Sequence, residues 1–466
     1  MEMLSLIKRN LGVFMALSFF LIVLSCTHFG KIFEYDPDEG LYLMRAFMHT
    51  KGYALYNQIW MDQPPLLVLM LSLLFKIFGP SVFLARVLTL CFSTLLLWAL
   101  YQIISKKQGI PSAILAIVLL VFSSYYLSMS VSVTGAIIPI SFAVLALYEI
   151  QLYQESCDKK FLLLSGAFFA LGLSTKLIAL LFLPALIWEI ALVEKKKILL
   201  SFAWWSASLL AVFTCISLAA HVDFYQIWHI YRAGEKVTSS IKIMHFFTFN
   251  KDYDYLLIAI CAFIFIKKEE IKLLAAPLMT LIAGLIFFSH TPIWHTQRFY
   301  LILPVCWLAS FSLYRLCGQI KTGKQKALVA VIFISAALGW SLLQIPLKWT
   351  NIRVQLFPSD PQASNIIGLI NKYNGRSHLL ITDRPIFAFY TQMFTDSHLL
   401  LLSQKTKSAR IITADDFLRT IRDKHPEMIL FARFPSLNAA IAKHLPKDYS
   451  LEFSNKSDIS LYIRKD

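Results

Sequence analysis

Charged residues are scarce in this sequence. Of its 466 residues, 15% are charged and 57% are hydrophobic, and the mean hydropathy is +0.62. Soluble domains carry about 25% charged residues, so this composition excludes an ordinary water-soluble protein of the same length. We expect a polytopic α-helical membrane protein.

Cysteine and glycine form no recognisable pattern. The seven cysteines have neither metal-ligand spacing nor a framework for disulfide pairing, and we interpret them as core thiols. The sequence also contains no glycine-rich loop of the kind that holds nucleotide phosphates. The net charge of +16 would suit nucleic acid, but basic loops facing the cytoplasm explain it better, and we expect no nucleic-acid partner.

Apolar segments recur as far as about residue 346, and their lengths predict eleven membrane spans. The spans are expected at about 11–29, 82–104, 111–128, 133–153, 161–176, 178–193, 198–220, 255–267, 271–289, 299–317 and 326–345. A cytoplasmic N-terminus places all fourteen Lys and Arg residues that adjoin the cytoplasmic ends of these spans on the inside, as the positive-inside rule requires. Lys8 and Arg9 followed by the apolar run to Cys26 also resemble a lipoprotein signal; a retained span is preferred because later spans already anchor the chain.

The segment 64–79 is apolar but short, begins with two prolines and contains Lys76. If it crossed the membrane, twelve of the fourteen basic residues would face outside. We therefore predict an interfacial helix here, within a first external loop of about residues 30–81. Residues 1–346 would form the transmembrane domain of an inner or plasma membrane protein.

Residues 347–466 contain no apolar run long enough to span a membrane, and we predict an extracytoplasmic soluble α/β domain there. Helices are expected at 361–373 and at 414–424, the second capped by Thr413, with strands at 378–382 and 428–432 and a hairpin of 449–454 with 459–464. Asp383, Arg384 and Pro385 follow a strand and are interpreted as a turn. The domain is expected to bind an acceptor or to cover the site.

The sequence YDPDEGLYLMRAF, residues 35–47, places three carboxylates after the first span. Pro37 fixes the preceding turn, and Asp38 is predicted to cap a helix from Glu39 to Thr50. Asp36 and Glu39 could then be ordinary solvated charges. Crowded carboxylates beside a membrane also raise one another's pKa, which makes one of them suitable as a general base.

The segment 35–90 resembles the first external loop of the GT-C glycosyltransferases, which include protein O-mannosyltransferases and the aminoarabinose transferases of lipid A. The resemblance rests on five short motifs. They are an acidic pair that opens a helix (Asp38 and Glu39), a Gly-Tyr motif (Gly52 and Tyr53), a Pro-Pro-Leu motif (Pro64 to Leu66), a Phe-Gly motif (Phe78 and Gly79) and an arginine (Arg86). It implies a GT-C fold. It also implies transfer of a sugar from a polyprenyl-phosphate donor to a lipid, glycan or protein acceptor on the outer side of the membrane.

The resemblance also implies roles for single residues. Asp38 would be the base of an inverting transfer, with Glu39 or Asp36 supporting it. Many relatives carry Lys immediately before the two prolines, where this sequence has Gln63, so either another cation meets the donor phosphate or Gln63 donates a neutral hydrogen bond to it. The predicted substrate-binding residues are Asp36, Tyr42, Tyr53, Gln63, Arg86, Lys176, His295 and Arg298.

Some of these assignments have simpler alternatives. Arg86 could anchor a span, and Arg298 could reach lipid headgroups. His290 and His295 lie five residues apart without a ligand pattern, so we expect neither a metal nor another cofactor. The competing functions are a transporter, disfavoured because Glu149 and Glu189 lie near cytoplasmic span ends, and a non-catalytic protein that binds a polyprenyl lipid.

Overall fold

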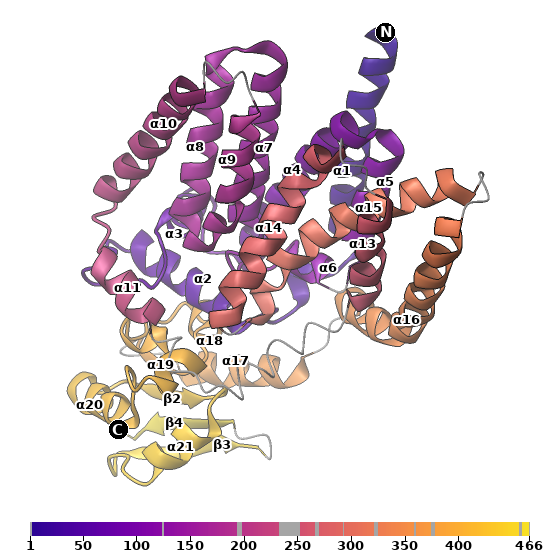
Figure 1. The fold of residues 1–466 in the computed structure, drawn as a ribbon. Helices are drawn as coiled ribbons and strands as arrows, with labels where there is room; N and C mark the ends of the chain where they lie inside the picture. Colours follow the sequence, from indigo (N-terminus) through magenta and orange to yellow (C-terminus); the bar gives the residue numbers. More distant parts are fainter. Residues whose placement is uncertain are drawn as a thin grey trace.

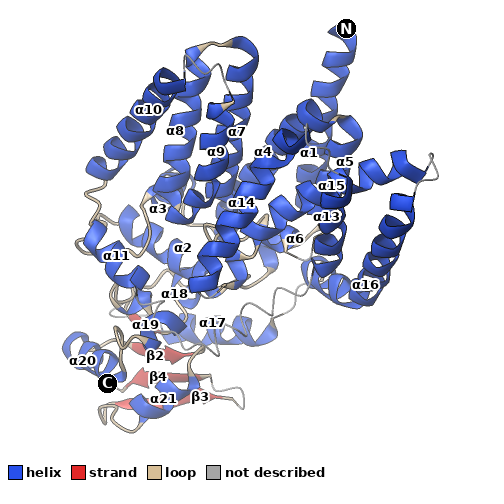
Figure 2. Cartoon of the chain, in the orientation of Figure 1, coloured by secondary structure: helices blue, strands red, loops and turns tan. Residues whose placement is uncertain are grey.

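The structure is a computed structural model, and it describes residues 2–123, 125–192, 198–232, 252–265, 270–291, 293–320, 325–357, 360–373, 378–455 and 459–465. Long helices form a bundle, and a small α/β unit lies at the end of the bundle opposite the N-terminus (Figure 1). The strands of the sheet all belong to this unit (Figure 2).

The predicted spans coincide with helices. These are α1 (Glu2–Cys26), α4 (Val82–Gln108), α5 (Ile110–Val121) with α6 (Tyr126–Met129), α7 (Ile137–Ser156), α8 (Lys159–Thr175), η2 (Leu177–Phe182) with α9 (Leu183–Ala191), α10 (Ile198–Ala219), α13 (Tyr253–Phe265), α14 (Ile271–His290), α15 (Phe299–Ile320) and α16 (Gln325–Leu356). Among the described residues, four helices are long and apolar enough to cross a membrane: α4, α7, α10 and residues 271–289 of α14. The number eleven remains a prediction.

Three predicted spans differ from the observed helices. The span expected at 111–128 is interrupted between α5 and α6, and the span expected at 178–193 begins as the 3₁₀ helix η2 before α9. The span expected to end at 345 continues through Pro346 to Leu356, so the predicted boundary at 346/347 falls inside α16. A proline inside a long helix kinks it more often than it ends it when neighbouring residues favour helix.

Two short helices form a platform beneath the bundle. They are α2 (Pro37–Thr50) and α3 (Leu66–Phe78), and they pack against each other. The 13 residues of α3 measure about 20 Å along the helix, short of the roughly 30 Å hydrocarbon core of a bilayer. This length agrees with the interfacial position predicted for 64–79.

The C-terminal elements agree closely with the predictions. The unit comprises α17 (Pro361–Tyr373), β1 (Leu380–Thr382), α18 (Ile386–Tyr390), η7 (Leu399–Leu401), α19 (Gln404–Ser408), α20 (Ala414–Lys424), β2 (Met428–Phe431), α21 (Pro435–Ala442), β3 (Tyr449–Ser454) and β4 (Ser460–Arg464). Thr413 caps α20, as predicted, in a capping box with Asp416. The strand order is β1-β2-β4-β3, with β1 and β2 parallel and Ile381 opposite Ile429.

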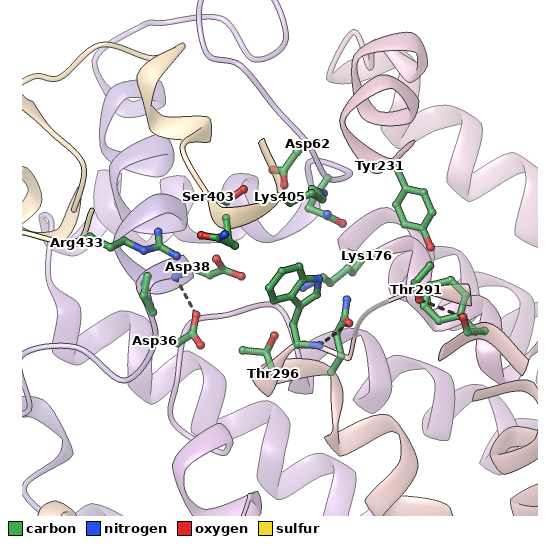
Figure 3. Close-up of a pocket in the computed structure, with 16 residues that line it drawn as sticks. Asp36, Asp38, Asp62, Lys176, Tyr231, Thr291, Thr296, Ser403, Lys405 and Arg433 are labelled. Atoms are coloured by element: carbon green, nitrogen blue, oxygen red, sulfur yellow. Dashed lines mark hydrogen bonds between the residues drawn. The ribbon is translucent and has the colours of Figure 1, made fainter. Parts of the chain in front are cut away.

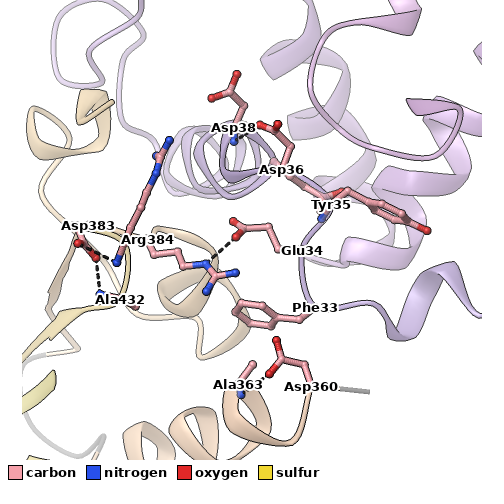
Figure 4. Close-up of polar contacts among 12 residues, drawn as sticks. Phe33, Glu34, Tyr35, Asp36, Asp38, Asp360, Ala363, Asp383, Arg384 and Ala432 are labelled. Carbon is pink, nitrogen blue, oxygen red and sulfur yellow. Dashed lines mark hydrogen bonds and ion pairs between the residues drawn. The ribbon is translucent and has the colours of Figure 1, made fainter. Parts of the chain in front are cut away.

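The carboxyl ends of β1 and β2 point toward the platform. Parallel strands end at the same edge of a sheet, so the residues after β1 and after β2 lie together there. The Nε atom of Arg384, which follows β1, donates to a Glu34 carboxylate oxygen at 2.7 Å, and Asp383 bonds the backbone after β2 (Figure 4). This edge therefore joins the α/β unit to the segment that precedes α2.

Helix α18 packs directly on α2. A Cβ atom added at Gly40 would lie 2.5 Å from the Ile386 backbone nitrogen, so only glycine allows this approach. The ring of Phe33 lies 4.7 Å from that of Phe387, and the Tyr390 hydroxyl donates to the Phe33 carbonyl at 3.2 Å. Buried residues of both parts belong to one continuous hydrophobic core, which fixes the unit against the platform.

Candidate active site

Asp36, and not Asp38, caps helix α2. The Asp36 Oδ1 atom accepts a hydrogen bond from the Asp38 backbone N–H at 3.0 Å, and α2 begins at Pro37. The prediction that Asp38 is the cap is therefore wrong, because Pro37 occupies the first helical position that it favours. Among the described residues no hydrogen bond or ion pair engages the Asp38 carboxylate, which faces a cavity (Figure 3).

Glu39 and Arg86 are engaged with each other. Both side chains are fully buried, and the Arg86 Nε and Nη2 atoms donate to the two Glu39 carboxylate oxygens at 2.9 and 2.6 Å. Arg86 also donates to the Phe29 and Ile32 carbonyls, each at 2.6 Å. Neither residue lines the cavity, and their ion pair joins α2 to α4.

The cavity has a volume of about 240 Å³ and lies where the platform, the bundle and the α/β unit meet (Figure 3). Residues that are far apart in the sequence contribute to it: Asp36, Pro37, Asp38, Asp62, Gln63, Lys176, Tyr231, Phe287, Thr291, Trp294, Thr296, Gln297, Ser403, Gln404, Lys405 and Arg433. Three carboxylates and three cations are among them. The α/β unit, which was predicted to bind an acceptor or to cover the site, contributes Ser403, Gln404, Lys405 and Arg433 to this lining.

The carboxylates of the cavity differ in their electrostatic surroundings. Burial, with a further contribution from the neighbouring Asp38, raises the pKa of Asp36 to about 7. Burial opposes ionisation of Asp62 as well, but Arg45, whose Nη1 lies 2.7 Å from Asp62 Oδ1, together with Lys405, lowers the pKa of Asp62 to about 2. Asp62 is therefore ionised at neutral pH, whereas Asp36 gains or loses its proton close to neutral pH.

The remaining predicted residues are divided between the cavity and the surrounding structure. Gln63 and Lys176 line the cavity, and the buried Tyr42 lines a smaller recess that adjoins it. Tyr53 instead packs its ring 5.8 Å from that of Phe394. The buried Arg298 lies outside the cavity lining, donates to the Tyr125 hydroxyl at 3.0 Å and stacks over its ring.

Two histidines considered as site residues, His290 and His295, cannot be placed relative to the cavity. The side chains of His290 and His295 lie outside the described part of the chain. Within the described residues, no group of three or more His, Cys, Asp or Glu side chains is arranged to hold a metal ion.

The cavity residues that escaped prediction include Asp62, Ser403, Lys405 and Arg433. Asp62 stands immediately before Gln63 in the motif, which was a usable signal. The other three lie in loops and a short helix of the α/β unit, where no local pattern marks them. Their contribution depends on how the unit packs against α2.

Comparisons with known proteins agree with this architecture. Residues 62–221 match the model of a family described as dolichyl-phosphate-mannose-protein mannosyltransferase. No curated protein sequence matches the chain.

Solved structures match over nearly the whole chain. The apo crystal structure of ArnT from Cupriavidus metallidurans superposes with a TM-score of 0.65 at 14% identity and covers 97% of each chain. The same protein bound to undecaprenyl phosphate gives 0.62 at 13% identity, again with 97% of each chain covered. The oligosaccharyltransferase of Archaeoglobus fulgidus gives 0.53 at 11% identity, over 98% of this chain and 74% of that one.

The arabinofuranosyltransferase AftD from Mycobacteria has a TM-score of 0.56 at 13% identity, over 98% of this chain and 41% of that one. These are GT-C glycosyltransferases, so the resemblance seen in residues 35–90 is confirmed as a shared fold. The chain has the GT-C fold. Among the structures compared, those of ArnT match over 97% of both chains.

Proposed function

We propose that the protein is an inverting glycosyltransferase that moves a sugar from a polyprenyl-phosphate donor to an acceptor hydroxyl on the extracytoplasmic side of the membrane. The observation that carries the proposal is the Asp38 carboxylate at the start of α2, which forms no hydrogen bond or ion pair within the described part of the chain and shares its cavity with Lys176 and Lys405. The volume of about 240 Å³ is slightly below the range of about 300–1,000 Å³ that is usual for small-molecule sites.

In this proposal Asp38 is the general base. The acceptor oxygen attacks the anomeric carbon while its proton passes to the Asp38 carboxylate. The bond between the anomeric carbon and the phosphate oxygen breaks, and its electron pair stays on the departing phosphate. Lys176, whose Nζ lies 3.5 Å from the Thr134 carbonyl, stabilises the charge that grows on the departing polyprenyl phosphate. The Glu39–Arg86 pair holds α2 and thereby sets the position of Asp38.

The relatives support the choice of donor class. One of the matched structures contains undecaprenyl phosphate, and the matched family is named for a dolichyl-phosphate donor. Both are phosphate esters of long polyprenols, and an apolar helix bundle beside a polar cavity can hold both parts of such a molecule. The transfer of a sugar to an acceptor hydroxyl and the extracytoplasmic position of the site are both parts of this proposal.

The proposal is tested by replacing Asp38 with Asn, which keeps the shape and removes the base. Full-length protein in vesicles would receive undecaprenyl phosphate carrying a labelled sugar, with a cell-envelope extract as the source of acceptor. We expect transfer to fall by about 10² to 10⁴, the usual contribution of a general base. Asp415→Asn is the matched control, because Asp415 is exposed on α20 and does not line the cavity.

The outcome separates the proposed enzyme from its rivals. A lipid-binding protein without catalytic activity would give no transfer even in the wild type, and a transporter would move the probe without cleaving it. Full transfer by the folded Asp38→Asn variant would remove Asp38 from the mechanism.

A further inference from the structure

The charges around the cavity separate into two groups on either side of Asp38. Arg433 interacts electrostatically with Asp36, Glu34 and Asp383. Lys405 interacts with Asp62, Asp38, Lys176 and Arg45. Asp38 adjoins both groups, because it also interacts with Asp36.

The group around Arg433 is rich in acid. Asp383 accepts hydrogen bonds from the backbone N–H groups of Ala432, Arg433 and Phe434 at 2.7, 3.1 and 2.8 Å. This arrangement fixes the backbone of Arg433 at the carboxyl end of β2. Three carboxylates therefore lie near Arg433, and one of them, Glu34, pairs with Arg384 at 2.7 Å.

The group around Lys405 has the opposite balance. Lys405, Lys176 and Arg45 supply three positive charges, whereas Asp62 and Asp38 supply two negative charges. Arg45 already pairs with Asp62 at 2.7 Å. Within the described residues neither lysine forms an ion pair, and both line the cavity.

The charges around Lys405 favour binding of an anion beside it. Burial lowers the pKa of Lys405, the two aspartates oppose this effect, and Lys176 and Arg45 add to it. A dianionic or monoanionic phosphate placed between the lysines would remove this repulsion. The cavity also contains Gln63, a neutral side chain that cannot supply the charge itself.

We propose that Lys405 of the α/β unit and Lys176 of the bundle together hold the phosphate of the polyprenyl donor, so that the donor site is shared between the two parts of the chain. This inference rests on the proposed function and names the residue that replaces the cation missing at Gln63. Ser403, the cap of α19, fixes the helix that carries Lys405 through a capping box with Thr406. The position of Lys405 thus depends on the docking of the whole unit on α2.

The test compares two probes that differ only in the phosphate, undecaprenyl phosphate and undecaprenol. Dissociation constants would be measured for the full-length protein in nanodiscs. We expect Lys405→Gln to weaken binding of undecaprenyl phosphate about tenfold or more, because a hydrogen bond to a charged group is lost, and to change undecaprenol binding less than twofold. Lys405→Arg should retain most of the affinity for the phosphate.

Lys443→Gln is the matched control, since Lys443 is exposed on the same unit and lies away from the cavity. Lys176→Gln should weaken phosphate binding to a similar extent, and the double variant should lose less than the product of the two single losses, because both lysines share one ligand. A thermal unfolding midpoint of the Lys405→Gln protein equal to or above that of the wild type would show that this variant remains folded.

Three results would overturn the inference. If the wild type prefers the phosphate and Lys405→Gln binds it equally well, Lys405 is not a ligand, while the proposed function stands. If excess phosphatidylglycerol competes as effectively as undecaprenyl phosphate, the lysines bind ordinary headgroups. If the wild type binds both probes alike, the proposed donor itself is wrong, and the inference falls with it.

Discussion

Replacing Glu39 with Gln should damage stability far more than replacing its neighbour Asp38. Glu39 and Arg86 form a bidentate ion pair in which both side chains are inaccessible to solvent. Glu39 also accepts hydrogen bonds from the Tyr35 and Val133 backbone N–H groups at 3.1 and 3.2 Å. Gln keeps the shape but leaves the Arg86 charge buried without a counter-ion, which typically costs about 3–5 kcal/mol.

This cost can be measured as a shift in thermal unfolding. At about 1 °C per kcal/mol for a chain of 466 residues, the Glu39→Gln protein in detergent should unfold roughly 3–5 °C below the wild type. The double variant Glu39→Gln/Arg86→Met removes both charges and should recover part of the loss, because the unpaired charge is gone. Unfolding of the single variant at the wild-type temperature, or strictly additive effects in the double variant, would refute the reasoning. The Asp38→Asn protein should unfold near the wild-type temperature.

Two further changes test the docking and the titration of the site. Gly40→Ala should reduce sugar transfer at least tenfold and expose the α/β unit to proteolysis, because the new Cβ would collide with the Ile386 backbone. Gly368→Ala, in open space on α17, is the control and should have neither effect. Unchanged proteolysis of the Gly40→Ala protein would contradict the docking argument. Stability should fall as the pH rises from about 4 to about 7, because burial raises the pKa of Asp36 and of Glu34 to about 7 each, so that the folded state retains protons that the unfolded chain has lost. Asp36→Asn, which can still cap α2, should flatten this fall in a series of unfolding midpoints; an unchanged slope would exclude Asp36 as a source.

The sequence predicted the elements of this fold well because their signals are local. Apolar runs identified the helices of the bundle, and Thr413 with Asp416 marked the start of α20. The strands β1 and β2 followed from short apolar runs bounded by turn residues. Where local signals competed, the predictions were less accurate: Pro346 suggested an end, yet α16 continues because apolar and helix-favouring residues follow it.

The site was harder to predict, since its members meet only through tertiary packing. The motif identified Asp38 and the segment around it, but both Asp36 and Asp38 could have capped α2. Lys405 carries no local pattern, and its importance depends on the edge of the sheet that faces α2. Glu39 and Arg86 show the opposite difficulty, because two charged residues of the motif pair with each other inside the protein and do not line the cavity.

The cavity walls come from segments made at very different times during synthesis. The first carboxylates of the cavity belong to α2, whereas Ser403, Lys405 and Arg433 leave the ribosome only after the whole bundle. A nascent chain that has inserted its helices therefore still lacks one wall of the cavity. The cavity is complete only after this last segment has folded onto Gly40 and its neighbours.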